Sequence, residues 1–418
     1  MKIKNKRNKT SILIKITEKA FLIIAILMVF QISCSKKTFA QESKYDSTEA
    51  IEKARDELIR NQLQSSEIKA LKEYLSEYAT GAGGKLLDEL NPDEIIKDAV
   101  KGDLKLNISK LTKKILSYFI QEIYLNLNIL LKLITIIIIC AVLNNLQNSF
   151  IKEGVGELAF FVCYIVIVSM LVIGFKEAAS FGINVIEQMA GFMYATIPVM
   201  VTLLISSGSI TSGGVFQPIL IMAVETAATI IKNVFIPIVF LSTALSIINN
   251  VSEKLHLERL AGLIKKIGMA FLGIILTIFI GVVTIQGPVS AVADGVVNKT
   301  IKFAIGTFIP VVGGYLSDAA DMVIGCSLLI KNAAGVLVML GVISICLIPV
   351  LKMSVIISLY KITCALTEPI SEKRITNCIN DVANSITLIL GAVAVVAFMF
   401  VISITVIIAA GNMTAMVR

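Results

Sequence analysis

Hydrophobic and polar positions are distributed differently in the first 126 residues and in the rest of the chain. Between residues 41 and 126, apolar residues such as Leu71, Leu75 and Tyr78 recur at helical spacing among charged neighbours. From residue 127 onward, apolar runs long enough for membrane-spanning helices follow one another. Residues 1–126 hold 39 of the 68 Asp, Glu, Lys and Arg residues, and residues 127–418 hold the other 29. This predicts a solvated helical front followed by a membrane-embedded part.

The first 40 residues have the order of a secretory signal peptide. A basic stretch precedes an apolar run from Ala20 to Ile32, and small residues follow. This run of about 13 residues is shorter than the roughly 20 that a transmembrane helix needs. We predict cleavage between Ala40 and Gln41, with an uncleaved membrane anchor or a lipoprotein attached through Cys34 as the alternatives. Each of the three places residue 41 outside the cytoplasm.

Residues 41–126 are predicted to be an extracytoplasmic helical segment. Asn91 and Pro92, followed by two acidic residues, form a helix-start signal. Over residues 104–123 an amphipathic pattern with lysines in its first half predicts a helix that lies on the membrane surface. Lys85 follows two glycines, but Leu86 stands where a phosphate loop needs Ser or Thr. We interpret the segment as a contact region for other proteins, with a plain spacer as the alternative.

Two membrane spans are predicted first, at residues 127–146 and 158–175, within a unit that covers residues 127–176. A tandem repeat then fills the rest of the membrane part. Its copies are predicted at residues 187–286 and 299–405, and a short tail follows at 406–418. The copies are parallel because each contains an even number of apolar segments, as in the halves of many transporters.

Four prolines, each between Ile and a β-branched residue, are the main sign of this repeat. Pro198 and Pro237 are 39 residues apart, Pro310 and Pro349 are also 39 apart, and the second pair is displaced by 112 residues. We expect each proline to kink a helix. Chance recurrence in an Ile-rich chain is the alternative.

Each copy contains four apolar segments. The segments are residues 190–206, 215–231, 234–251 and 267–285 in the first copy, and 302–318, 327–343, 346–363 and 386–405 in the second. The first two of each copy are short and interrupted by Gly and Pro, so each pair is either two spans or a re-entrant hairpin. The chain therefore has six to ten spans. With residue 41 outside, both basic loops, at 252–266 and at Lys373, fall inside, as the positive-inside rule requires.

Several charged residues lie within the apolar part, where insertion costs at least about 2.5–3.5 kcal/mol per charge. The candidates for an intramembrane pathway are Glu187, Glu225, Asp318, Asp321, Lys331 and Lys361; Lys132 and Asp294 are further intramembrane charges. Asp318 and Asp321 are one helical turn apart, and Glu225 has the longest apolar surroundings. A proton or cation pathway is one interpretation. Snorkelling to the interface, or salt bridges between helices, is the other.

Composition and charge exclude several classes of protein. Only 16% of the residues are charged, against about 25% in soluble globular proteins. The net charge of +8 belongs to residues 1–40 alone, so no nucleic-acid-binding surface is expected. The seven cysteines and His256 have no metal-ligand spacing, and no cofactor motif is present, so we predict neither metal nor cofactor. An enzyme is not expected; a membrane protease is the remaining, weaker alternative.

Motifs in the second half of the chain resemble the stage III sporulation protein AE family of endospore-forming bacteria. These motifs are Thr284-Ile285-Gln286-Gly287, Ala293-Asp294-Gly295, Phe308 to Gly313, Ser317-Asp318-Ala319, Lys331 to Gly335, and Lys361 with Glu368-Pro369-Ile370; Gly102 fits at the front. The resemblance implies a protein of the mother-cell membrane around the forespore. It also implies a trans-envelope complex with the other stage III A proteins and a forespore partner, and it supplies no catalytic residue.

The sequence thus predicts an all-α, polytopic membrane protein with a helical extracytoplasmic segment and a tandem parallel repeat. One functional hypothesis is a non-enzymatic component of a sporulation channel, needed for forespore development and late forespore gene expression. The other is a secondary transporter that moves a small solute or ion through the repeat interface. Its partners are expected to be membrane proteins and the lipid bilayer.

Overall fold

A computed structural model describes residues 48–78, 92–101, 108–150, 153–251, 256–308 and 313–417, and all regular elements within them are helices. Three short helices come first: α2 (Thr48–Leu63), α3 (Ser66–Tyr78) and α5 (Pro92–Lys101). The long helices follow in the order α6 (Ile108–Phe150), α7 (Glu153–Ser206), α8 (Ile210–Ile230), η2 (Ile231–Phe235), α9 (Ile236–Val251), α10 (Glu258–Phe308), α11 (Gly313–Thr367) and α12 (Lys373–Val417). The predicted signal peptide and its cleavage site at Ala40 and Gln41 lie outside the described residues, as does Asn91.

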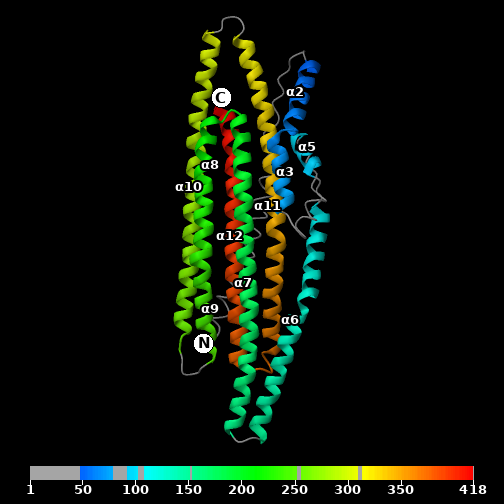
Figure 1. Cartoon of the computed structure of the whole chain (residues 1–418), viewed down its shortest axis with the longest axis vertical. Helices are drawn as coiled ribbons and strands as arrows, with labels where there is room; N and C mark the ends of the chain where they lie inside the picture. Colours follow the sequence, from blue (N-terminus) through cyan, green and yellow to red (C-terminus); the bar gives the residue numbers. More distant parts are fainter. Residues whose placement is uncertain are drawn as a thin grey trace.

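The long helices form an elongated antiparallel bundle (Figure 1). Among the described residues, six helices, with α8, η2 and α9 counted as one, are long and apolar enough to cross a membrane. The α7–α8 and α10–α11 connections lie at one end, and the α6–α7, α9–α10 and α11–α12 connections lie toward the other (Figure 1). Arg259 and Lys373 therefore lie at the same end of the bundle, as the predicted topology requires. The assignment of that end to the cytoplasm stays a prediction.

The helices are much longer than the bilayer is thick. The 55 residues of α11 extend about 80 Å at 1.5 Å per residue, whereas the hydrocarbon core measures about 30 Å. Helix α12 packs against α7, α9, α10 and α11. The rings of Phe192 and Phe400 meet edge to face between α7 and α12, with centroids 5.4 Å apart.

The helix boundaries correct the predicted division into short segments. Residues 158–175 and 190–206 belong to one helix, α7, and residues 327–343 and 346–363 belong to α11. The segment 302–318 is divided between α10 and α11. The polar residues between the segments, such as Glu187, do not end the helices, because Glu and its neighbours have good helix propensity and no turn signal follows them. Six long helices result, and the tandem repeat stays a prediction.

The surface helix predicted at 104–123 is also corrected. From Ile108 onward it is the first part of α6, which continues without a break through the first span. The pattern predicted the amphipathic helix correctly but could not show that no turn separates it from the apolar run.

Three of the four predicted kink prolines fall among the described residues. Pro198 and Pro349 lie inside α7 and α11. Pro237 follows η2, a π-helical turn that joins α8 to α9 into one continuous helix. A proline cannot donate a hydrogen bond to the carbonyl one turn earlier, and a wider turn accommodates that loss. Pro310 lies outside the described residues.

The N-terminal helices pack on the bundle through their apolar sides. Ile59, Ile68, Leu71, Leu75 and Ile96 are buried in the main core. Helices α2, α3 and α5 contact α11, and α3 also contacts α7. The predicted contact region thus uses its apolar face within the chain, and its charged face remains on the outside.

Candidate functional site: charged residues within the helix bundle

Asp294 on α10 holds the start of α8. Its carboxylate accepts hydrogen bonds from the backbone N–H of Thr211 at 2.6 Å and of Ser212 at 3.1 Å. Asp294 is 1% exposed, so the charge is buried at the end of a helix whose first N–H groups lack intrahelical partners. A carboxylate there is stabilised by the hydrogen bonds and by the helix dipole. The sequence predicted that Asp294 is an intramembrane charge, and the structure shows that its carboxylate caps the start of α8.

The same stretch of α10 holds the α7–α8 turn. The side-chain amide of Asn298 donates to the carbonyl of Gly208 at 2.9 Å. Gly208 has a φ of +85°, a conformation that side-chain-bearing residues rarely adopt. Asp294 and Asn298 are one turn apart on α10, so one face of this helix fixes the turn from both sides.

Lys331 on α11 is buried against the C-terminal part of α12. Its ammonium donates to the carbonyl of Ile408 at 3.0 Å. Beside it, the side-chain amide of Asn332 donates to that of Asn412 at 3.1 Å. A Cβ at Gly411 would lie 2.0 Å from the Lys331 nitrogen, so α12 approaches α11 closely because residue 411 has no side chain. Lys331 thus joins two helices within the core.

Glu187, Glu225 and Lys232 lie on an outer face formed by α7, α8 and η2. Glu187 forms an ion pair with Lys232, and both side chains are about half exposed. Glu225 is exposed and lines a shallow open groove of about 530 Å³ on α8 together with Gln217, Pro218, Ile221 and Met222.

The remaining candidates lie apart from this groove. Lys302 on α10 pairs with Asp321 on α11 at 2.7 Å, next to the α10–α11 connection, and Asp318 is exposed one turn away. Lys361 is half-buried toward the other end of α11. Among the described residues, no contact joins Glu225 to Asp318 or Asp321, and the two acidic positions lie at different places in the bundle.

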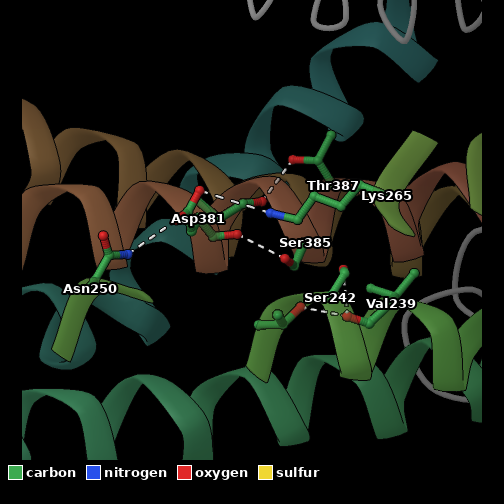
Figure 2. A network of polar contacts seen from close by, with 9 residues as sticks. Val239, Ser242, Asn250, Lys265, Asp381, Ser385 and Thr387 are labelled. Atoms are coloured by element: carbon green, nitrogen blue, oxygen red, sulfur yellow. Dashed lines mark hydrogen bonds and ion pairs between the residues drawn. The ribbon is translucent and has the colours of Figure 1, made fainter. Parts of the chain in front are cut away.

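A further polar network was missed by the sequence analysis. Asp381 on α12 accepts a hydrogen bond from Asn250 on α9 at 3.2 Å and lies 3.9 Å from the ammonium of Lys265 on α10 (Figure 2). The network ties three helices together near the connections at one end of the bundle. An acidic residue at the start of a long uncharged run was the available signal, since residues 382–417 contain no charged residue.

A bundle of six long apolar helices, with charges placed in helix caps and ion pairs, defines the class as a polytopic helical membrane protein. The family model described as stage III sporulation protein AE matches residues 90–411. A protein of that name from Bacillus subtilis (strain 168) is 32% identical over 400 residues, which cover 96% of this chain and 100% of that protein. This chain belongs to the stage III sporulation protein AE family. No solved structure matches it.

Proposed function

We propose that the chain is a non-enzymatic membrane component of the channel complex that joins the mother cell and the forespore during sporulation. The observation that carries the proposal is the family match over residues 90–411, which includes five of the six apolar helices in full and nearly all of α12. Its place is the mother-cell membrane around the forespore, with the N-terminal segment outside the cytoplasm. Its role there is to support forespore development and late forespore gene expression.

The proposed partners are the other stage III A membrane proteins and a protein of the forespore membrane. The exposed charges of α5, at Glu94, Lys97 and Asp98, support this, because Ile95 and Ile96 of the same helix are already buried on the bundle. Charged, solvated faces suit specific contacts with other proteins in the space between two membranes.

Co-purification from sporulating cells in a mild detergent tests this proposal. The tagged full chain is expected to recover at least one stage III A protein. A matched variant with Glu94→Arg and Asp98→Arg on the exposed side of α5 is expected to recover less of it at equal chain level. Recovery of the intact chain without any stage III A protein would overturn the proposal.

The transporter alternative is favoured by one observation, the exposed carboxylate of Glu225 in its groove on an apolar helix. The test compares Glu225→Gln with Asp318→Asn and Asp321→Asn, each at normal protein level. Loss of sporulation in Glu225→Gln alone would support a solute path along α8. Normal sporulation in all three variants would eliminate this alternative.

A further inference from the structure

The N-terminal helices lie beside the apolar middle of α11. The side-chain amide of Gln62 on α2 donates to the hydroxyl of Ser327 at 2.9 Å. A Cβ at Gly341 would lie 2.2 Å from Leu75 of α3 and 3.3 Å from Phe192 of α7. Helices α2 and α3 therefore run along residues 327–341 of α11 (Figure 1). Residues 332–351 of α11 contain no charged residue, as expected of a segment at bilayer depth.

Helix α10 lies on the other side of the bundle from α2 and α3, with α12 and α11 between them (Figure 1). A Cβ at Gly335 of α11 would lie 2.4 Å from Ile408 of α12, and one at Gly287 of α10 would lie 3.4 Å from Val406 of α12. Measured along the bundle axis, these contacts place Gly287 within a few helical turns of Leu75. Around it, Ile285 is 70% exposed and Val289 is 67% exposed.

The two sides expose opposite kinds of residue. On α2 and α3, the exposed charged residues are Asp56, Glu57, Arg60, Lys69, Glu73 and Glu77. On α10, residues 267–293 contain no charged residue over a length of about 40 Å, enough to cross the hydrocarbon core. Lipid suits the α10 side, but charges facing hydrocarbon cost at least about 2.5–3.5 kcal/mol each. In a monomer surrounded by lipid, the exposed charges of α2 and α3 would therefore face hydrocarbon.

We propose that several copies of this chain form a ring in which α10 faces the lipid and the charged sides of α2 and α3 line an aqueous lumen. Copies in one membrane share one orientation, and identical head-to-tail contacts between them form a ring when the rotation from one copy to the next closes. The exposed charges of α2 and α3 have both signs, so the lumen wall suits small hydrated solutes of either charge. The inference deepens the proposed channel function by naming the surface that lines the path.

Cysteine labelling in intact membranes tests which side of the helix bundle faces water. Single substitutions Lys69→Cys and Glu73→Cys on α3 are compared with Ile285→Cys and Val289→Cys on α10, and Leu241→Cys on the apolar exterior of α9 is the control. A charged, membrane-impermeant methanethiosulfonate is added from outside the cytoplasm, and each rate is corrected for the unsubstituted chain. We expect the α3 sites to react at least tenfold faster than the other three. Equal labelling rates at positions 69 and 285 would overturn the proposal that α3 lines an aqueous lumen.

The depth of α3 is tested by the pair Leu75→Cys and Gly341→Cys. A disulfide between them is expected to form in the membrane, because the two positions touch. Its absence in a chain whose Lys69→Cys site is labelled would place α3 away from the bundle and overturn the inference.

Co-expression of two differently tagged copies tests the ring. Each tag is expected to recover the other copy from the membrane. If each complex contains one copy of this chain but still includes a stage III A protein, the ring is overturned and the proposed function stands. If neither a second copy nor a stage III A protein is recovered, both fail together.

Discussion

Asp294 and Glu225 are both acidic residues within apolar helices, but the structure treats them in opposite ways. Asp294 is 1% exposed, and two backbone N–H groups of α8 bond to its carboxylate. Glu225 is exposed in an open groove. A buried carboxylate with backbone partners is part of the fold, whereas an exposed one at this position is free to contact solute or protein. Burial and hydrogen-bond partners, and not charge alone, separate the two roles.

The largest expected effect follows from removing the cap. Asp294→Ala leaves two backbone N–H groups buried without acceptors and should lower the free energy of unfolding by about 3 kcal/mol. Asp294→Asn keeps one acceptor oxygen and should cost less. Thermal unfolding in detergent, together with the chain level in membranes, measures both.

Asp318→Asn is the matched control for the cap, because Asp318 is exposed and its amide should change stability by less than about 0.5 kcal/mol. If Asp294→Ala were as stable as Asp318→Asn, the claim that Asp294 stabilises the fold by capping α8 would be wrong.

A second effect tests whether Lys331 serves the packing of α11 on α12. Gly411→Ala places a methyl group against the Lys331 ammonium and should cost about 2 kcal/mol, since the core around it is close-packed. In a Lys331→Ala background the same substitution should cost almost nothing. The coupling between the two sites in a double-mutant cycle is the quantity to measure.

Lys331→Met sharpens this test. Methionine has a similar shape and no charge to desolvate, so stability should be unchanged or higher. If Lys331→Met has normal stability but abolishes sporulation, the charge of Lys331 is needed for function and not for folding.

The sequence predicted the helices and the class of protein because apolar length and spacing determine both. It did not predict how the segments join. The partner of Glu187, for example, is Lys232, which is 45 residues away and on another element. Likewise the partners of Asp294 are backbone groups at residues 211 and 212, and backbone groups leave no pattern in the sequence. Candidate charges could be chosen from the sequence, but their roles depend on contacts between distant segments.

The smallest expected effect concerns the ion pair between Glu187 of α7 and Lys232 of η2, which lies on the outside of the bundle. Both side chains are about half exposed, so the pair should contribute less than about 1 kcal/mol to folding. Glu187→Lys or Lys232→Glu alone should reduce stability slightly, and the double exchange should restore it because the opposite charges face each other again. Unfolding in detergent at low and high salt measures the difference, since salt screens exposed pairs. A loss of sporulation in the double exchange, with stability restored, would show that the sign of each charge on this face matters for function, and would group the pair with Glu225.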